Sequence, residues 1–386
     1  MKKPTVAEIT GVMNCGGAEL MLMNILRRLH NDFHFVFVIV VTDEDHKTGE
    51  FDDEIRALGA ELVYIESMRT IGIGEFQKRL TQMFRQMAPD VAHCHLNSKC
   101  GVVAKCAHEA GVAKIISHSH ARLKFRGNPI SAAASYAELY WERGMINRYS
   151  TDFWGCSADA LRSLYTKKNR HSAKSKIVYN LIDGDRFTKA DPQKTEGLRQ
   201  SLGLQDKLVL GVVGRIAPVK NHIFAVDVLA QVLQQRKDAV LLIVGAKQFK
   251  DYTQTLFAKI QSMGLEKNVV YLPPRKDIEC VYPLMDICLG TSIREGASLT
   301  AIEAQLSGCY TMISPGYLKL VDLGLGLLKQ EPEFSAAQWA QDLLARGRSA
   351  DGPTPEARRQ ALIDKGFDLN TEIDKIKAEY AGSTRQ

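Results

Sequence analysis

The sequence has no long hydrophobic run. Its longest apolar stretches, such as Phe35–Val41, end near seven residues, whereas a helix that spans a membrane needs about 20. The N-terminal segment has two lysines but no apolar core like that of a signal peptide. Proline is limited to 12 residues, no low-complexity tract occurs, and apolar residues make up 45% of the chain. These features exclude a disordered, collagen-like or coiled-coil chain, and we expect a cytoplasmic globular protein.

Paired cysteine motifs are also absent. The eight cysteines are scattered, so we expect buried, reduced thiols rather than a disulfide framework. One region looks superficially like a metal site, but its spacing matches no usual zinc pattern, and we expect no metal. Its residues are His93, Cys94, His95, Cys100, Cys106 and His108.

Short Val- and Ile-rich runs alternate with amphipathic stretches along the whole chain, which is the pattern of parallel sheets joined by helical crossovers. Expected strands in the first half are Val6–Thr10, His34–Val41, Leu62–Glu66, Val91–Leu96, Lys114–Ser117, Thr151–Cys156 and Lys176–Asn180. Those in the second half are Leu208–Val213, Val240–Val244, Val269–Leu272, Ile287–Leu289 and Thr311–Ile313. The expected fold class is therefore α/β, with two doubly wound domains that face each other across a ligand-binding cleft.

A polar, turn-like segment separates the two halves. We divide the chain into an N-terminal domain at 1–187, a linker at 188–206, a C-terminal domain at 207–370 and a final helix at 371–386 that packs back on the N-terminal domain. Expected helices include Ala132–Arg148, Ile278–Leu284 and Glu372–Tyr380. Pro353 and Pro355 are expected in a loop before the final helix.

A Gly-Gly turn follows the first expected strand. Gly16 and Gly17 permit a tight backbone, and a helix opens at Ala18. Free amide groups at such a turn suit an anion or a polar ligand. The G-x-G-x-x-G dinucleotide fingerprint and the Walker loop are both absent, and a purely structural turn is the alternative.

Two cations and two carboxylates mark the second half. Arg215 and Lys220 follow its first strand in a single loop, an arrangement that suits a diphosphate. Glu295 and Glu303 are eight residues apart, and a helix starts near Ser298, where free amides favour phosphate. The alternatives are two solvated loop cations and a pair of glutamates that only cap a helix or face solvent.

Histidines end two expected strands of the first half. His93 and His95 alternate along a strand and so point to the same face. His118 and His120 follow the apolar residues of another strand. Such residues can hydrogen-bond a ligand, act as a base, bind metal, or simply be satisfied polar groups.

Positive charge is concentrated in one segment. The net charge is +6, yet residues 114–176 carry twelve Lys or Arg and four acids, a local +8. This segment holds the helix Ala132–Arg148 with Tyr140 and Trp141, preceded by Arg122, Lys124 and Arg126. A basic, aromatic face suits an anionic partner such as a membrane surface, nucleic acid or a phosphorylated ligand. A solvated face without a partner, or an ordinary core-packing helix, is the alternative.

Taken together, these segments resemble the family-4 retaining glycosyltransferases, which have the GT-B fold of two Rossmann-like domains. The matches follow the family's order along nearly the whole chain. They are Gly16–Glu19, Asp90–His95, Ser117–His120, Cys156 with Ser157, Tyr179–Asp183, Arg186 with Phe187, Gly214 with Arg215, Lys220 with Asn221, Val244 with Gly245, and Glu295–Ala304. The histidine segments resemble members that build capsular, exopolysaccharide or O-antigen repeat units.

The resemblance implies retaining transfer of a hexose or N-acetylhexosamine from a nucleotide diphosphate sugar, a UDP-sugar before others, to a glycan or a polyprenyl-diphosphate-linked acceptor. By it, Arg215 and Lys220 bind the diphosphate, Glu303 the ribose, Glu295 the transferred sugar, and His118 the sugar near its 6-position, with His120 as second choice. The donor-binding residues that it implies are Gly16, Gly17, Arg215, Lys220, Arg275, Glu295, Gly296, Ala297, Ser298, Leu299 and Glu303. It implies no metal cofactor, because the cations and the helix dipole neutralise the leaving diphosphate.

The same resemblance gives the basic segment a meaning. Because the resemblance implies a lipid-linked acceptor, it also suggests residues for acceptor binding or for peripheral docking on the inner face of the cytoplasmic membrane. These candidates are Arg122, Lys124, Arg126, Tyr140 and Trp141. Two segments depart from the family pattern. Leu-Pro-Pro-Arg at 272–275 stands for Leu-Gly-x-Arg, which leaves base recognition there open, and Asn-Leu-Ile-Asp at 180–183 lacks a glycine.

Other classes fit less well. A catalytically inactive protein that kept the fold and binds nucleotide sugars is the main alternative, and the intact set of Arg215, Lys220, Glu295 and Glu303 argues against it. A nucleotide-sugar epimerase or a phosphorylase of the same fold has no supporting motif. No nucleic-acid-binding module is recognisable, so we expect no nucleic-acid partner.

Overall fold

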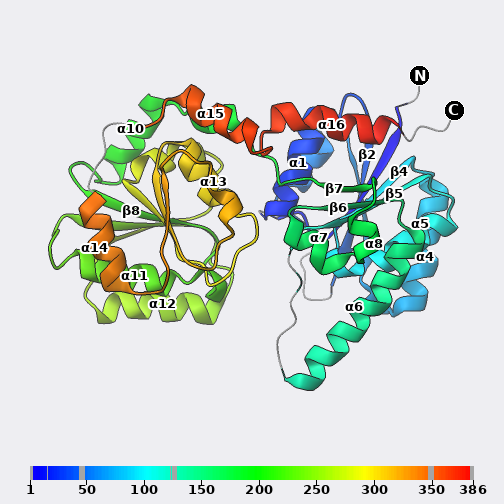
Figure 1. The fold of residues 1–386 in the computed structure, drawn as a ribbon, viewed down its shortest axis with the longest axis horizontal. Helices are drawn as coiled ribbons and strands as arrows, with labels where there is room; N and C mark the ends of the chain where they lie inside the picture. Colours follow the sequence, from blue (N-terminus) through cyan, green and yellow to red (C-terminus); the bar gives the residue numbers. More distant parts are fainter. Residues whose placement is uncertain are drawn as a thin grey trace. The chain divides into compact units, whose positions relative to one another are not determined.

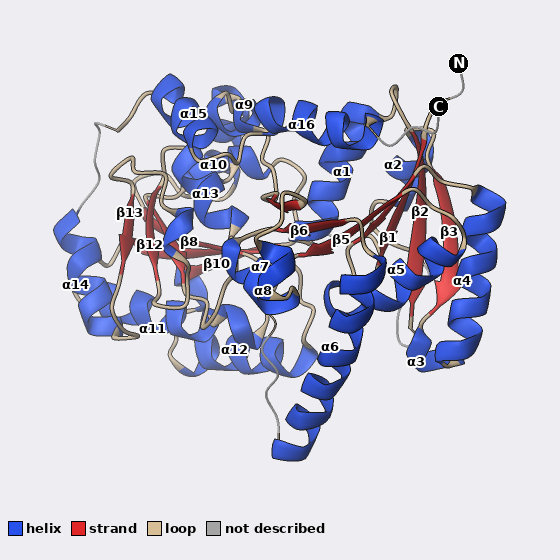
Figure 2. Cartoon of the chain, turned by 45° about the vertical axis from the view of Figure 1, so that its right-hand side comes forward, coloured by secondary structure: helices blue, strands red, loops and turns tan. Residues whose placement is uncertain are grey.

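The computed structural model describes residues 3–14, 16–42, 48–121, 123, 128–346 and 352–382. It consists of two compact units. Unit 1 comprises Met1–Leu181 and Leu369–Gln386, and unit 2 comprises Ile182–Asp368. Each unit is a parallel sheet with helices on both faces (Figures 1 and 2). The predicted α/β class with two doubly wound domains is confirmed.

Unit 1 is built on a seven-stranded sheet of order β3-β2-β1-β4-β5-β6-β7. The strands are β1 (Thr5–Thr10), β2 (His34–Val41), β3 (Glu61–Glu66), β4 (Val91–Cys94), β5 (Lys114–Ser119), β6 (Asp152–Gly155) and β7 (Ser175–Ile177). The helices are α1 (Gly17–Leu29), α2 (Asp52–Ala57), α3 (Met68–Ile71), α4 (Ile73–Met87), α5 (Cys100–Glu109), α6 (Pro129–Tyr149), α7 (Ala158–Leu164), α8 (Lys167–Arg170) and α16 (Leu369–Ala381), with the 3-10 turn η1 (Asn97–Lys99).

Unit 2 is built on a six-stranded sheet of order β10-β9-β8-β11-β12-β13. The strands are β8 (Leu208–Val213), β9 (Ala239–Val244), β10 (Val269–Leu272), β11 (Ile287–Gly290), β12 (Tyr310–Ile313) and β13 (Leu328–Gln330). The helices are α9 (Gly184–Thr188), α10 (Pro192–Ser201), α11 (His222–Val232), α12 (Lys250–Ser262), α13 (Leu299–Leu306), α14 (Ala336–Arg346) and α15 (Pro355–Asp364). The 3-10 turns are η2 (Pro218–Lys220), η3 (Glu266–Asn268), η4 (Ile278–Cys280), η5 (Tyr282–Leu284) and η6 (Lys319–Val321).

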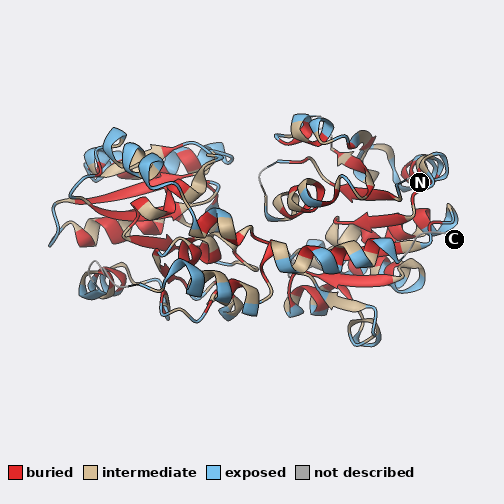
Figure 3. Cartoon of the chain, turned by 90° about the horizontal axis from the view of Figure 1, so that it is seen from above, coloured by how far each residue is buried: buried red, intermediate tan, exposed pale blue. Residues whose placement is uncertain are grey.

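The central strands are buried on both faces, which is why they read as continuous apolar runs. All six residues of β1 are buried. Val6 packs with α1 and α16 on one face, and Ile9 packs with α4 and α5 on the other. Figure 3 shows the same layering, with buried strands between helices whose outer faces are exposed. Polar side chains within these strands are therefore enclosed, and they need partners.

The predicted linker at 188–206 is wrong, because α10 occupies most of it. The Asp191 side chain accepts hydrogen bonds from two amides of the first turn, at 2.9 and 3.2 Å, and Pro192 stands in that turn. Thr354 and Pro355 start α15 in the same way, where a loop was predicted. A polar cap followed by proline is a helix start, and both segments were mistaken for turns.

Several boundaries also differ from the predictions. Residues 182–187 belong to unit 2, where α9 packs on α13 and α15. The single helix predicted at Ile278–Leu284 is two 3-10 turns, because Pro283 cannot continue an α-helix. Helix α16 begins at Leu369 and packs in unit 1, with Ile373 and Tyr380 in the core beside α1 and β2.

Candidate active site

In unit 2 the chain leaves β8 at Gly214 and reaches α11 through η2. Gly214 and Gly245, which follow β8 and β9, have φ angles of 146° and 153°. A Cβ at Gly245 would lie 2.0 Å from the Gly214 carbonyl oxygen, so only glycine lets these strand ends approach so closely. Thr291 Oγ1 donates to the carbonyl of Lys220 at 2.8 Å. This bond ties the loop after β8 to the loop after β11, the neighbouring strand.

Lys220 and Glu295 meet at this edge of the sheet. Lys220 Nζ donates to Glu295 Oε1 at 2.5 Å, and Ser292 Oγ donates to the same oxygen at 2.7 Å. The side chains are 20% and 14% exposed, so the pair is partly desolvated but still open to a ligand. A small pocket beside it is lined by Ser292, Thr300 and Tyr317 as well as by Lys220. The two residues that the sequence assigned to diphosphate and sugar are thus brought together.

The start of α13 borders the same loop. Ser298 is buried and stands at the N-cap, but its side chain pairs with Thr300 Oγ1 at 3.0 Å instead of capping the helix. Gly296 has open space where a Cβ would stand, and Ala297 and Leu299 are half-buried. A helix start whose side-chain cap is turned aside can receive an anion from the solvent side.

Glu303 lies one turn into α13, where its Oε2 accepts a hydrogen bond from the Tyr282 hydroxyl at 2.7 Å. Burial raises the pKa of Glu303, and the hydroxyl and the charge of Arg186 partly oppose that rise. Tyr282 is fully buried on η5. Tyr282 was not predicted as a site residue, because an isolated tyrosine before a proline has no distinctive pattern.

The two predicted arginines are held by neighbours rather than by the pair of Lys220 and Glu295. Arg215 is exposed, and its Nη1 donates to Gln248 Oε1 at 2.7 Å. Arg275 follows β10 and forms a forked pair with Asp277, at 2.8 and 2.8 Å. Lys220 is therefore the predicted cation that this structure places against a predicted carboxylate.

In unit 1, Gly16 and Gly17 start α1. Gly16 is the extended N-cap residue, and a Cβ there would lie 2.2 Å from a carboxylate oxygen of Glu19. A Cβ at Gly17 would lie 3.1 Å from the side-chain nitrogen of Asn180. The two glycines therefore allow the Glu19 carboxylate and the Asn180 side-chain amide to pack closely against this turn.

Buried polar groups gather at the carboxyl ends of β1, β4 and β5. His93 Nδ1 lies 2.7 Å from the Tyr380 hydroxyl, and His93 Nε2 lies 3.1 Å from His118 Nδ1. The Tyr380 hydroxyl in turn donates to Glu8 Oε1 at 3.0 Å. Helix α16 therefore supplies the link between a carboxyl of β1 and the histidines of β4 and β5.

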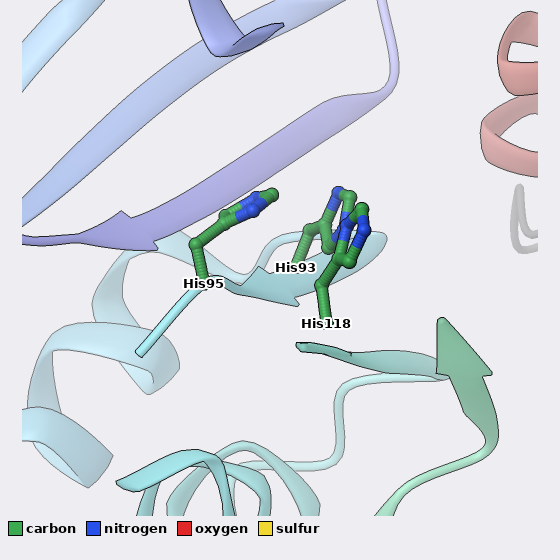
Figure 4. A group of neighbouring side chains, drawn as sticks. All are labelled: His93, His95 and His118. Carbon is green, nitrogen blue, oxygen red and sulfur yellow. The ribbon is translucent and has the colours of Figure 1, made fainter. Parts of the chain in front are cut away.

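A second chain of hydrogen bonds leaves the same carboxyl. Glu8 Oε2 lies 2.8 Å from His95 Nε2, and His95 Nδ1 lies 2.8 Å from His120 Nε2. The rings of His93 and His95 are 4.0 Å apart (Figure 4). The same-face placement predicted from their alternation is confirmed.

Burial keeps this histidine network uncharged. It raises the pKa of Glu8 to about 8 and lowers the pKa of His95 to about 3. It also lowers the pKa of His93, His118 and His120 well below the ordinary value for histidine. Near neutral pH the rings are therefore neutral, and the position of each ring proton is set by hydrogen bonds.

Two family models match the chain. The Glycosyltransferase Family 4 model covers residues 15–186, and the Glycosyl transferases group 1 model covers residues 194–340. The chain is a family-4 glycosyltransferase.

The relatives of this glycosyltransferase agree with that placement. Bacillus subtilis EpsF, named as a glycosyltransferase, is 26% identical over 99% of this chain and 97% of its own length. An Escherichia coli enzyme named UDP-Gal:alpha-D-GlcNAc-diphosphoundecaprenol alpha-1,3-galactosyltransferase is 22% identical over 81% of this chain and 79% of its own. The crystal structure of Anabaena HepE with UDP matches with a TM-score of 0.78 at 21% identity, over 100% of both chains. The GT-B fold is thereby confirmed.

Among the described residues of the glycosyltransferase, one group of side chains has the spacing of metal ligands. The ligand atoms of His93, His95 and His118 lie within 4.8 Å of one another. Both ring nitrogens of His93 and of His95 already have hydrogen-bond partners, so a metal would have to displace those bonds. The satisfied-polar interpretation therefore explains His93 and His95, and the absence of a metal cofactor stays a prediction.

Helix α6 of the glycosyltransferase carries the predicted aromatic face. Leu139, Glu142 and Ile146 are buried, whereas Tyr140 and Trp141 are 68% and 46% exposed. In Figure 1 the first half of α6 extends away from the sheet of unit 1. The alternative of an ordinary core-packing helix therefore applies to one face of the second half of α6, the face that carries Leu139, Glu142 and Ile146. Arg122, Lys124 and Arg126 lie outside the described residues, and no described helix is long and apolar enough to cross a membrane.

Proposed function

We propose that this enzyme transfers a hexose or N-acetylhexosamine, with retention of anomeric configuration, from a UDP-sugar to a glycan or lipid-linked acceptor in surface polysaccharide synthesis. The observation that carries the proposal is the Lys220–Glu295 pair, held by Ser292 at the sheet edge beside the start of α13. The names of two matched proteins support the substrates. The name of the Escherichia coli galactosyltransferase contains UDP-Gal and a diphosphoundecaprenol-linked acceptor. The structure of Anabaena HepE was solved with UDP.

The charges of unit 2 suit a leaving diphosphate. Lys220 supplies a cation, Arg215 supplies a second one at the surface, and the start of α13 supplies its positive dipole end. Together they stabilise the negative charge that develops as the bond from the sugar to phosphate breaks, a contribution that usually dominates such catalysis. In this proposal Glu303, held by Tyr282, accepts hydrogen bonds from ribose hydroxyls.

Glu295 acts in this proposal by positioning the sugar. Its Oε1 is occupied by Lys220 and Ser292, which leaves Oε2 to accept a sugar hydroxyl. The acceptor oxygen bonds to the anomeric carbon on the face that the phosphate leaves, and the departing phosphate oxygen takes the acceptor proton. Retaining glycosidases differ, because one of two carboxylates becomes covalently bound to the sugar. Mass spectrometry that detected a glycosyl–Glu295 adduct would refute this role.

Release of nucleoside diphosphate from a panel of nucleotide sugars tests the activity. One donor should be turned over, with the rate increased by a suitable acceptor. If no donor is turned over and none shifts the melting temperature, the chain is an inactive relative rather than an enzyme. Turnover that survives a chelator supports the absence of a metal requirement, and loss of turnover that Mg²⁺ restores would refute it.

We propose that α6 contacts the acceptor or an anionic membrane surface. Tyr140 and Trp141 are exposed in the segment that carries the local +8, and such aromatic side chains insert between lipid head groups. Cosedimentation with vesicles that contain anionic lipid tests the docking, and no binding at low salt would end the idea.

A further inference from the structure

Glu8 stands where the two hydrogen-bonded chains of unit 1 join. One chain runs through Tyr380 and His93 to His118, and the other runs through His95 to His120. Glu8, His93 and His118 are fully buried and His95 is 4% exposed. The last atoms of the two chains, His118 Nε2 and His120 Nδ1, are buried and have no described hydrogen-bond partner of ordinary geometry. The backbone of Val178 and the side chain of Asn180 nevertheless lie near enough to raise the pKa of His118 and of His120 against the larger effect of burial.

The protons of this network can be counted. It contains five hydrogen bonds, and four neutral imidazoles with one phenol supply five protons. If Glu8 is ionised, all of them lie inside the chains, so both end nitrogens present lone pairs. If Glu8 is protonated, one proton is in surplus, and it emerges as an N–H at one of the two ends.

We propose that Glu8 is a positioning residue of the transfer site, which sets through these two chains whether His118 Nε2 and His120 Nδ1 accept or donate a hydrogen bond. The inference rests on the proposed function in one respect, namely that a substrate hydroxyl meets one of these histidines. An end nitrogen with a lone pair accepts a hydrogen bond from the substrate hydroxyl. An end nitrogen with a proton instead donates a hydrogen bond to the oxygen of that hydroxyl. The two states therefore hold a sugar differently without any movement of the backbone.

The surroundings of the second end favour this role. The side-chain oxygen of Asn180 is also buried without a partner, and Asn180 raises the pKa of His120 against the larger effect of burial. A surplus proton on His120 Nδ1 therefore has an acceptor close by. Asn180 also lies against Gly17 at the start of α1. The end of the chain is thus next to the Gly-Gly turn for which the sequence predicted ligand binding.

Few charged side chains near Glu8 could change its protonation. Besides the residues of the network, α16 presents Glu379 beside Tyr380, and Glu379 is paired with Lys114 of β5 and Lys176 of β7. The buried residues that α1 and β2 add to the same core are apolar, for example Met21 and Phe37. The raised pKa of Glu8, about 8, makes both of its protonation states accessible near neutral pH.

Histidine ring spectra test the inference without any substrate. Two-bond ¹H–¹⁵N spectra of ¹⁵N-histidine-labelled protein distinguish the two tautomers of each ring, and His118→Gln and His120→Gln assign the two end residues. In wild type we expect the N–H at the chain ends to disappear between about pH 6 and about pH 9, as Glu8 ionises. In Glu8→Gln the amide always supplies the surplus proton, so the end N–H should persist. Identical tautomers in both proteins at every pH would overturn the inference.

Tyr380→Phe separates the two chains. It keeps the ring that packs against Phe33 and Phe35 but removes the hydroxyl that bridges Glu8 and His93. The direct approach of His93 Nδ1 to Glu8 Oε2, at 3.5 Å, is longer than the bonds of the bridge and remains. We expect mixed tautomers at His93 and His118, while His120 continues to follow Glu8. Tyr165→Phe is the matched control, because this buried hydroxyl is bonded to backbone carbonyls outside the network, and it should change no tautomer. An unchanged His118 in Tyr380→Phe would overturn the inference even if Glu8→Gln failed to fold.

Kinetics then separate the two proposals. With a donor that wild type turns over, Glu8→Gln should lower kcat by about tenfold at high pH and flatten its pH profile, with a smaller change in donor KM. An altered tautomer with a wild-type pH profile would refute the positioning role alone. Absence of turnover in wild type would refute the proposed function, whereas the ring spectra would still decide whether Glu8 controls the histidines.

Discussion

The two units build polar sites at the same place in the same kind of sheet, yet they treat charge differently. Unit 1 buries Glu8 with its histidines, and burial keeps each of them neutral near pH 7. Unit 2 leaves Lys220 and Glu295 partly exposed, as an ion pair. Fold alone therefore does not set the chemistry at the end of a strand. The buried polar groups of unit 1 are suited to control of proton positions. The partly exposed pair of unit 2 is suited to binding of a charged ligand.

The comparison is tested most strongly by removal of the cation of unit 2. In Lys220→Ala the diphosphate loses a cation and Glu295 loses its partner, so we expect donor turnover to fall by roughly 10²–10³-fold. The free energy of unfolding should change far less, by about 1–2 kcal/mol, because Glu295 keeps the hydrogen bond from Ser292 and some contact with solvent. Initial rates of nucleoside diphosphate release and urea unfolding measure the two effects.

The matched control for this variant is Lys259→Ala. It removes another partly exposed ion pair of unit 2, with Asp227 at 2.6 Å, and should leave turnover unchanged. Equal turnover in Lys220→Ala and wild type would show that the charge of unit 2 does not serve the reaction.

The neutral state of unit 1 has a signature in the pH dependence of stability. The pKa of Glu8 is about 8 in the folded chain against an ordinary 4.5, so between these values the folded chain keeps a proton that the unfolded chain has released. Stability from this group is therefore lost as pH rises through that window. The four buried histidines, whose pKa is lowered, contribute the opposite slope in both proteins. We therefore expect the unfolding free energy of Glu8→Gln, relative to wild type, to rise by about 2–4 kcal/mol between about pH 5 and about pH 8.

Urea unfolding of both proteins at the two pH values measures this difference. Glu109→Gln, which changes an exposed carboxyl of α5, should leave the wild-type difference intact. If Glu8→Gln does so too, Glu8 is ionised in the folded chain and the contrast between the units fails.

A smaller effect is expected for the carboxyl of unit 2 that resembles Glu8 most. Glu303 is bonded to a buried tyrosine, as Glu8 is, but we assign it to ligand binding. Glu303→Gln should raise donor KM by about tenfold, with little change in kcat, because a neutral amide accepts a ribose hydrogen bond more weakly than a carboxylate does. Steady-state rates over a range of donor concentrations measure it. The exposed Glu266→Gln is the control, and a changed kcat with an unchanged KM would contradict the assignment.

The smallest effect concerns the exposed aromatic face of unit 1. Replacing Tyr140 and Trp141 together by alanine should weaken binding to anionic vesicles by about fivefold, through loss of apolar contact, while donor turnover in solution is unchanged. Phe249→Ala removes an aromatic side chain of unit 2 that is 48% exposed, and it should leave vesicle binding as in wild type. An equal loss in both would mean that the two units do not differ in membrane contact.

The strands could be predicted well because burial on both faces leaves a local mark. His34–Val41, Leu208–Val213 and Val269–Leu272 have the predicted bounds. Strand β13 was missed, since all its residues are only half-buried and the segment lacks an apolar run. Helices α10 and α15 were missed for the different reason that their proline and cap residues also occur in turns.

The site of unit 2 was accessible from sequence because its residues lie in short motifs. Lys220 and Glu295 were both predicted as ligand-binding residues, although 75 residues separate them. Glu8 and Tyr380 were missed, since they are 372 positions apart in the chain and neither belongs to a motif that we recognised. One local sign did exist: a lone glutamate within a strand whose residues are all buried must be neutral or paired.

Helix α16 has a consequence for how the protein is made. It completes unit 1, yet it follows residues 182–368, the whole of unit 2, in the chain. During synthesis the ribosome therefore adds Tyr380 only after both sheets have been translated. Until then Glu8 lacks its phenol partner, and the apolar face of β1 and α1 that α16 covers is left open. A chaperone that shields this face, or rapid folding of unit 2, would protect the half-made chain, and truncation before Leu369 should yield aggregated protein.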